Sequence, residues 1–280
     1  MADAARRLAE AGVASPRVDA ELLLAHVLDV PRARLLTLAD VPGDPAARFA
    51  DLLDQRAGRV PLQHLTGRAP FRHLELAVGP GVFVPRPETE LLVEWALARL
   101  ADGAAPVVVD LGAGSGAIAL SLAHEHPGAR VTAVERDDGA IEWTRHNAAV
   151  RTAAGDTPVE VLAGDMTDRQ LLTALDGTVD LVVSNPPYVP DGARVPREVA
   201  DHDPPMALWG GPDGLDVVRG LLHTAARLLR PGGHLGIEHA DQQGAALPAL
   251  VRGHGGFTDV ADHSDLAGRP RFTTARRAAE

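Results

Sequence analysis

The stretch VDLVVSNPPY, residues 179–188, decides how this chain folds. Its first half is rich in β-branched and other apolar residues, the pattern of a strand buried on both faces of a parallel sheet. Pro186 and Pro187 cannot donate to a β-ladder, so the strand must end at Asn185. An amide, two proline carbonyls and the Tyr188 ring therefore lie at the carboxyl end of a strand, the edge where open α/β sheets bind ligands.

The residues from Asn185 to Tyr188 suit one task, which is to hold a planar NH2 group. The side-chain oxygen of Asn185 and the carbonyl of Pro186 can each accept a hydrogen bond. Both prolines fix φ, so these acceptors are aimed in advance, and the Tyr188 ring offers a flat face. A plain strand-ending turn is the alternative, because Asn-Pro often initiates turns. The motif alone leaves both interpretations open.

Composition limits the class of protein. The chain has 280 residues, of which 45% are hydrophobic, enough for one large domain or two modest ones. Cysteine is absent, which excludes disulfides, a thiolate nucleophile and a cysteine metal site. The sequence after Met1 has no secretory pattern, and no apolar run reaches about 18 residues. We therefore expect a soluble, cytoplasmic protein that does not associate with membranes.

The charge balance is acidic. The formal net charge is −11 and the isoelectric point is near 5.5. Proteins that bind DNA or RNA phosphates usually carry a basic surface. The sequence therefore predicts no direct contact with nucleic acid.

Residues 1–73 read as a small helical bundle. Helix starts are predicted at Ser15-Pro16, Pro31 and Asp44-Pro45, where proline occupies the first turn. Such a bundle could simply cap the next domain, or it could serve as a platform for a macromolecular substrate. The pattern does not separate these alternatives.

A linker and a larger domain follow the bundle. Residues 74–86 alternate in polarity and are interrupted by Gly79-Pro80-Gly81, which predicts a β-hairpin linker. In the rest of the chain, 87–280, strands and helices alternate, as expected for a doubly wound parallel sheet. The loop at 189–214 is the longest and directly follows Tyr188. Strands are predicted at 106–110, 130–135, 158–163, 179–184 and 232–239, helices at 115–126, 137–151, 213–229 and 242–252, and an antiparallel edge at 256–262 and 270–277.

A glycine-rich loop, VVVDLGAGSG at 107–116, follows the first predicted strand of this domain. Its glycines let the backbone approach a ligand closely. A dinucleotide site is the usual alternative for such a loop. Asp110 stands just before the glycines, where it would repel a pyrophosphate but suit a cationic amino-acid group.

Acidic residues also end the next two strands. Glu135 lies about twenty residues beyond the loop, where an acid typically holds ribose hydroxyls. Asp165 could accept from an adenine amino group while Met166 packs against the ring. Each acid alone is more often a helix cap or a solvated loop charge than a ligand-binding residue. Together they predict an S-adenosylmethionine site formed by Asp110, Gly112, Ala113, Gly114, Ser115, Gly116, Glu135, Asp165, Met166 and Asn185.

These motifs resemble a known family. The glycine loop, the two acids and the NPPY motif look like those of class I methyltransferases that act on an amide or amino nitrogen. Three further segments, PLQHLTG at 61–67, VPRPETE at 84–90 and EHADQQG at 238–244, are similar to the HemK/PrmC family of peptide chain release factor N5-glutamine methyltransferases. The similarity runs over nearly the whole chain. The departures are Met166, where the family often carries an aromatic residue, and His64, where tyrosine is common.

The resemblance implies a Rossmann-like class I fold with a mostly parallel seven-stranded sheet, joined through the hairpin to the N-terminal bundle. It implies methyl transfer from S-adenosylmethionine to the glutamine amide nitrogen (N5) of the Gly-Gly-Gln motif in class I release factors, which supports translation termination. The product would be S-adenosylhomocysteine, with no metal involved and a monomeric enzyme. The resemblance assigns catalysis to Asn185, Pro186 and Tyr188, and substrate binding to these residues and Pro187.

Other activities remain open at this stage. A sister group methylates a glutamine of a ribosomal protein, and the NPPY motif is shared with enzymes that methylate amino groups of nucleic-acid bases. The acidic charge and the lack of a separate basic domain disfavour the second. A non-catalytic binding module is also conceivable, but the intact set of glycines, acids and Asn185 disfavours it.

Overall fold

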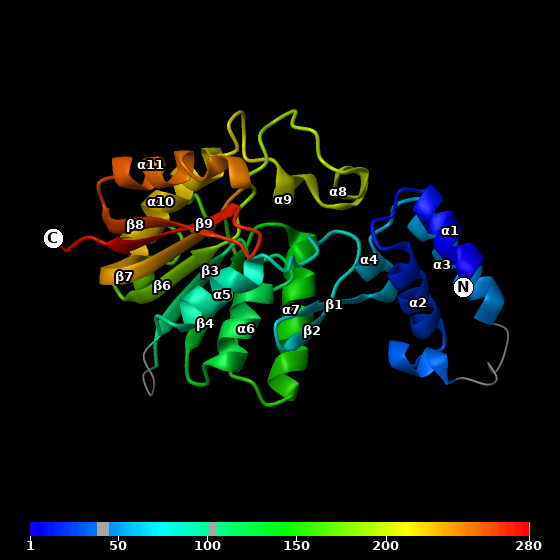
Figure 1. The fold of residues 1–280 in the computed structure, drawn as a ribbon. Helices are drawn as coiled ribbons and strands as arrows, with labels where there is room; N and C mark the ends of the chain where they lie inside the picture. Colours follow the sequence, from blue (N-terminus) through cyan, green and yellow to red (C-terminus); the bar gives the residue numbers. More distant parts are fainter. Residues whose placement is uncertain (38–44, 101–104, 280) are drawn as a thin grey trace. The chain divides into compact units, whose positions relative to one another are not determined.

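The computed structural model describes residues 1–37, 45–100 and 105–279, and the chain divides into two compact units (Figure 1). The sequence predicted a division at 73 and 86. The observed units differ because a segment of the long loop after Tyr188 belongs with the helical bundle. The N-terminal unit comprises residues 1–68, 78–80 and 195–203, and the C-terminal unit comprises 69–77, 81–194 and 204–280.

Short helices make up the N-terminal unit. The predicted start at Pro16 is confirmed, but the Ser15 side chain makes no capping hydrogen bond. After Pro31 the chain forms a 3₁₀ helix, and the Asp44 part of the third predicted start lies outside the described residues. The elements are α1 (Ala2–Glu10), α2 (Pro16–Val27), the 3₁₀ helix (Arg32–Leu36), α3 (Pro45–Ala57), α4 (Leu62–Thr66) and α8 (Arg197–His202), with a core of Ala4, Leu8, Val13, Ala20 and Leu53.

A buried ion network joins three parts of this unit. Arg56 of α3 is only 6% exposed, and its Nε lies 2.8 Å from Oδ2 of the equally buried Asp19. Its Nη1 lies 2.8 Å from Oε2 of Glu198 on α8 and also donates to the carbonyl of Val60. Arg59 contacts the same Glu198 carboxylate at 3.2 Å. These contacts explain why α8 belongs with helices that precede it by more than a hundred residues.

The β-hairpin begins earlier in the chain than predicted. Its strands are β1 (Arg68–Phe71) and β2 (Leu74–Ala77), and Gly79-Pro80-Gly81 lies beyond them. The turn falls at Arg72, which adopts a left-handed φ of 49°. The Arg72 side chain forms two hydrogen bonds to Glu125, and its backbone N–H donates to Glu90. These long-range contacts hold a turn that residue type alone does not predict.

The C-terminal unit contains a mostly parallel, seven-stranded sheet, as predicted. The seven strands have the order β5-β4-β3-β6-β7-β9-β8, with β9 antiparallel to its two neighbours β7 and β8 and the other paired strands parallel. The strand bounds agree with the predicted ones to within about three residues. The strands are β3 (Val107–Leu111), β4 (Arg130–Glu135), β5 (Glu160–Ala163), β6 (Val179–Ser184), β7 (Leu229–Glu238), β8 (Phe257–Ser264) and β9 (Pro270–Arg277).

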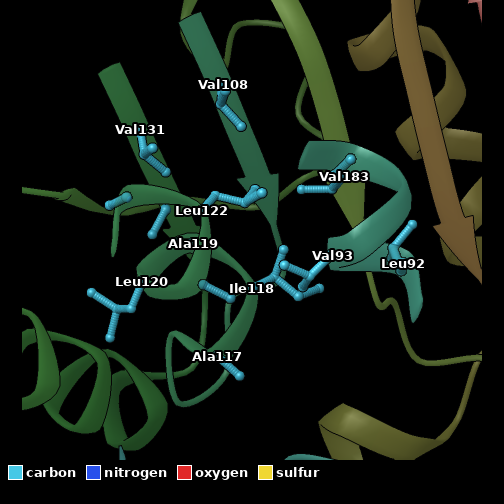
Figure 2. Packing of buried hydrophobic residues seen from close by; sticks show 14 of the residues in the cluster. Leu92, Val93, Val108, Ala117, Ile118, Ala119, Leu120, Leu122, Val131 and Val183 are labelled. Atoms are coloured by element: carbon cyan, nitrogen blue, oxygen red, sulfur yellow. The ribbon is translucent and has the colours of Figure 1, made fainter. Parts of the chain in front are cut away.

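Helices cover both faces of the sheet (Figure 1). Alternate residues of the buried strands face opposite ways, so Val108 packs in one core cluster with α5 and α6, and Val109 in a second with α10 and α11. Figure 2 shows the first cluster, where side chains of α5 and α6 meet Val108, Val131 and Val183. The helices are α5 (Thr89–Leu97), α6 (Ala117–Glu125), α7 (Asp138–Ala153), α9 (Pro205–Leu208), α10 (Asp216–Leu228) and α11 (Ala246–Gly253).

The strand order places a topological switch point between β3 and β6. From β3 the chain winds outward through β4 and β5, then returns to the other side of β3 as β6. The two neighbours are parallel, with Val109 opposite Val182. Ligands bind at such a point in open α/β sheets. The glycine loop after β3 and the NPPY motif after β6 therefore share one edge.

Candidate active site

The glycine loop connects β3 to α6 in a conformation that requires glycine. Gly112 has φ +85°, and a Cβ there would lie 2.6 Å from Cε of Met166. Gly116 has φ +86°, and a Cβ would meet Leu120 of α6 at 2.9 Å. Gly112 also lies near the Asn185 carbonyl, since its Cβ position is 3.8 Å from that oxygen. The loop thus brings together the predicted residues Gly112, Met166 and Asn185.

Two polar residues of α7 support this loop, and the sequence analysis missed both. The Thr144 hydroxyl donates to the Gly114 carbonyl at 2.6 Å. The Asn147 amide donates to the Ser115 carbonyl at 2.9 Å and also bonds both backbone groups of Ala77. Both side chains are buried. The available signal was a threonine and an asparagine three residues apart on the apolar face of a predicted helix.

Glu135 lies at the end of β4, beside the glycine loop. Its Oε2 accepts from the Gly114 N–H at 2.9 Å, and its Oε1 accepts from the N–H groups of Arg136 and Asp137. Each carboxylate oxygen has two lone-pair positions, so further acceptor capacity remains. The carboxylate is therefore held rigidly by backbone donors at the place where ribose hydroxyls are expected.

Asp165 and Met166 follow β5. Burial opposes ionisation of Asp165, but hydrogen bonds from Thr167 and Arg136 outweigh it, so the Asp165 pKa lies below its usual value. Arg136 Nη1 lies 3.2 Å from Asp165 Oδ2, and both side chains are partly exposed. Met166 is buried against Gly112. The Asp165–Arg136 contact was not predicted from sequence.

Asp110 is fully buried in β3. Its Oδ2 accepts from the Ala119 N–H at 3.1 Å, near the start of α6, and its Oδ1 has no hydrogen-bond partner. The Asp110 pKa is raised to about 7. Burial is the largest cause and the nearby Glu135 charge adds to it, while the hydrogen bond from the Ala119 N–H opposes the rise. An unpartnered buried acceptor beside the glycine loop suits a cationic amino group.

We predict that Asp110 makes the unliganded protein less stable as the pH rises. The Asp110 pKa is about 7 in the folded protein and 3.8 in the usual exposed state, so the folded state binds the proton more tightly. This preference stabilises the folded protein fully below pH 3.8, and the stabilisation is lost as the pH rises through about 7. The Asn side chain does not ionise, so Asp110→Asn should lack this loss. Between about pH 5 and pH 8, the free energy of unfolding of the wild type should therefore fall relative to that of the variant by on the order of 3 kcal/mol. Urea denaturation across this range measures it. A difference between the two proteins that stays constant with pH would contradict it.

The NPPY motif leaves β6 at the switch point. The Ser184 hydroxyl donates to the Leu111 carbonyl at 2.5 Å, which ties the ends of β6 and β3 together. Asn185 is half-buried, whereas Pro186 and Pro187 are buried. The Asn185 Nδ2 donates to the Thr89 hydroxyl at 3.3 Å. Thr89 belongs to the VPRPETE segment, so this segment lies against the motif.

The base of the long loop is fixed to Tyr188. Val189 pairs with Trp209 in an isolated bridge, so the two ends of the loop run side by side. Gln243 of the EHADQQG segment donates from Nε2 to the carbonyls of Tyr188 and Asp213 at 3.0 and 3.1 Å. Gly214 packs directly against the Tyr188 carbonyl, where a side chain has no room, because a Cβ at this position would lie 2.1 Å from the carbonyl oxygen. The loop also differs from its prediction, since it contains α8 and α9.

A buried carboxyl lies beneath the motif. Glu238 at the end of β7 is 1% exposed, and its Oε1 accepts from the Tyr188 hydroxyl at 3.4 Å. Burial raises the Glu238 pKa to about 7, while the Thr89 hydroxyl and Arg271 lower it. Burial, together with the Glu238 charge, raises the pKa of Tyr188, so its hydroxyl stays protonated. The sequence analysis noted both segments but gave neither Thr89 nor Glu238 a role.

The residues present fit S-adenosylmethionine. Gly112 leaves the space that a Cβ would fill, Asp110 has an unpartnered acceptor, and Glu135 is held by backbone donors. Within residues 1–37, 45–100 and 105–279, no group of three or more His, Asp or Glu is placed to hold a metal ion. In the same part of the chain no helix is both long and apolar enough to cross a bilayer.

Comparison with known proteins agrees with this fold and site. Two family models match: the PrmC N-terminal domain over residues 1–67 and the methyltransferase small domain over 74–201. A methyltransferase structure from Pyrococcus furiosus shares the fold with a TM-score of 0.53 and 19% identity, covering 84% of this chain and 100% of that one. The sheet, the glycine loop and the NPPY edge define a class I S-adenosylmethionine-dependent methyltransferase.

Similar sequences narrow this class. The release factor glutamine methyltransferase of Mycolicibacterium smegmatis is 54% identical over 272 residues, which is 97% of this chain and 94% of the relative. The one from Streptomyces coelicolor is 52% identical over 285 residues, covering 99% and 97%. The chain belongs to the release factor glutamine methyltransferase family, which confirms the resemblance drawn from its motifs.

Proposed function

We propose that this chain methylates the side-chain amide nitrogen of the glutamine in the Gly-Gly-Gln motif of class I peptide chain release factors, with S-adenosylmethionine as methyl donor and S-adenosylhomocysteine as product. The observation that carries the proposal is the shared edge at which the glycine loop and Asn185 meet, with Gly112 beside the Asn185 carbonyl. It is supported by close relatives that bear this activity as their name.

The bound cofactor supplies an electrophilic methyl group on a sulfonium. The amide nitrogen is a weak nucleophile because its lone pair is delocalised into the carbonyl. The Asn185 side-chain oxygen and the Pro186 carbonyl accept its two N–H groups, so they orient the nitrogen and stabilise the positive charge that develops on it. Pro187 fixes the turn, and the Tyr188 ring covers the flat amide. No side chain needs to remove a proton before transfer.

Cofactor binding falls to the glycine loop and the acids around it. Asp110 and the loop residues Gly112, Ala113, Gly114, Ser115 and Gly116 take the amino-acid part, Glu135 the ribose, and Asp165 with Met166 the adenine. The partner is a release factor, and residues 1–73 serve as its platform. We propose a monomeric, cytoplasmic enzyme that contacts no nucleic acid directly, in keeping with a net charge of −11.

Labelled S-adenosylmethionine tests this function. The full chain is incubated separately with a class I release factor, a short Gly-Gly-Gln peptide, a ribosomal protein and duplex DNA, followed by peptide mapping. Label on the Gly-Gly-Gln glutamine of the release factor is the expected result, with far less on the short peptide. Label on the ribosomal protein or DNA alone would overturn the proposal, and equal turnover of the peptide and the whole factor would overturn the platform.

Glu135→Ala should weaken S-adenosylmethionine binding by about 1.5–3 kcal/mol, the range for a hydrogen bond to a charged group. The variant also frees the Gly114 N–H, which the carboxylate holds at 2.9 Å. Calorimetry on the folded variant measures the affinity. Glu142→Ala, an exposed change on α7, is the control and should leave it unchanged. Equal affinities in all three proteins would remove Glu135 from the site.

A further inference from the structure

The Asn185 amide can turn either of two ways. Its oxygen and nitrogen ends have nearly the same size, so a half-turn of the amide costs little in packing. With the oxygen toward the substrate, it accepts a hydrogen bond from the acceptor NH2. With the nitrogen toward the substrate, two donors face each other and the contact is repulsive. Some feature of the protein must therefore select one orientation.

Thr89 is placed to make that selection. It is 4% exposed, and its hydroxyl lies 3.3 Å from Asn185 Nδ2. A hydroxyl carries a single proton. If Thr89 donates this proton to Asn185, it must face the amide oxygen, and if it donates elsewhere, its oxygen can accept from the amide nitrogen. If the proton points away from Asn185, the Thr89 oxygen is free to accept from Nδ2.

Glu238 decides where that proton points. The Tyr188 hydroxyl donates to Glu238 Oε1 at 3.4 Å, and Thr89 lowers the pKa of the buried Glu238 carboxyl, which is the effect of a hydroxyl that donates to it. The Glu238 side chain is 1% exposed, and its Oε2 has no hydrogen-bond partner, so this oxygen keeps acceptor capacity for the Thr89 proton. An ionised carboxylate can only accept, so both hydroxyls must donate to it. The hydrogen bonds then run one way, from Asn185 through Thr89 to Glu238.

We infer that Thr89 and Glu238 are positioning residues, which hold the Asn185 amide with its oxygen toward the acceptor nitrogen and fix the Tyr188 ring by its hydroxyl. The inference rests on the proposed function, since it assumes that Asn185 receives an NH2 group. Neither residue touches the reacting atoms. Their effect passes through Asn185 and Tyr188, so they act on the rate of transfer and little on cofactor affinity.

The first test breaks and restores the chain of hydrogen bonds. Thr89→Val removes the hydroxyl at constant shape and should lower kcat about 10-fold, as for one lost hydrogen bond. The KM for S-adenosylmethionine should hardly change. Thr89→Ser restores the hydroxyl and should return kcat to about wild type. Thr224→Val, an equally buried change on α10, is the matched control. A kcat of Thr89→Val equal to wild type, or an equal loss in Thr224→Val, overturns the inference.

The second test uses the pH profile. The charged groups that face Glu238 are Arg271 on β9 and Glu88 before α5, the neutral Tyr188 hydroxyl also faces it, and burial raises the Glu238 pKa to about 7. The carboxylate form is the one that orients Asn185, so wild-type kcat should rise as pH increases through this region. Glu238→Gln can donate as well as accept, so its kcat should be about 10-fold lower and should lose that rise. An unchanged profile in Glu238→Gln overturns the inference.

The third test needs no substrate. Tyr188 is the single tyrosine of the chain, so tyrosine labelled with ¹³C at the carbon that bears the hydroxyl gives one resonance. The signal should move in Glu238→Gln, because a charged acceptor is lost, and stay in Thr224→Val. A resonance that does not move overturns the inference. If the wild-type chain transfers no methyl group to a release factor, the proposed function fails, while this test still judges the network.

Discussion

Asn185→Ala should lower kcat for release-factor methylation by about 10²–10³, as for the loss of one preorganised electrostatic contact. The side-chain oxygen is one of the two acceptors proposed for the substrate NH2. The strand end, both prolines and the Ser184 bond to Leu111 remain, so the fold should survive. Single-turnover kinetics with saturating cofactor measure the effect, and calorimetry should find a much smaller change in cofactor affinity.

Asn185→Asp sharpens this prediction, because it keeps an acceptor and adds a charge near the bound sulfonium. We expect reduced kcat with cofactor affinity unchanged or tighter. The added carboxylate also loses the N–H that now donates to Thr89 at 3.3 Å. Near-wild-type turnover in both variants would mean that Asn185 is a turn residue and that the nitrogen is held elsewhere.

Arg56→Ala should destabilise the N-terminal unit by about 3–5 kcal/mol, the cost of leaving a buried charge without its partner. Asp19 is 7% exposed and would lose the guanidinium at 2.8 Å, and Glu198 would lose one of its two arginine contacts. Far-UV circular dichroism during urea unfolding measures the loss. Helix α8 should also lose protection against amide hydrogen exchange, since Arg56 is a direct contact to it.

Two comparisons make this result specific. All three tryptophans, Trp95, Trp143 and Trp209, belong to the C-terminal unit, so their fluorescence transition should move less than the dichroism. Arg6→Ala removes an exposed pair with Asp3 and should cost less than about 1 kcal/mol. If Arg56→Ala unfolds like Arg6→Ala, the network does not stabilise the unit.

Local signals in the sequence determined most of the elements. β-branched runs predicted the strands of the sheet within about three residues, because a strand buried on both faces must be apolar throughout. Prolines fixed where β6 ends, and left-handed glycines fixed the loop after β3. The motifs also gave the family, since each combines residue types that one chemistry requires. Such features depend on the backbone preferences of neighbouring residues, which the sequence states directly.

Tertiary structure decided which of these features meet. The turn at Arg72 is held by Glu90 and Glu125, so local composition placed the hairpin too late. Thr89, Tyr188 and Glu238 come from three separate segments, and α8 joins the N-terminal unit through Arg56. Periodicity could not find them, because a buried polar side chain is stabilised by its partner rather than by its neighbours in sequence. The sequence by itself determined the strands, the glycine loop and the acceptor motif, and packing alone decided the partners that orient them.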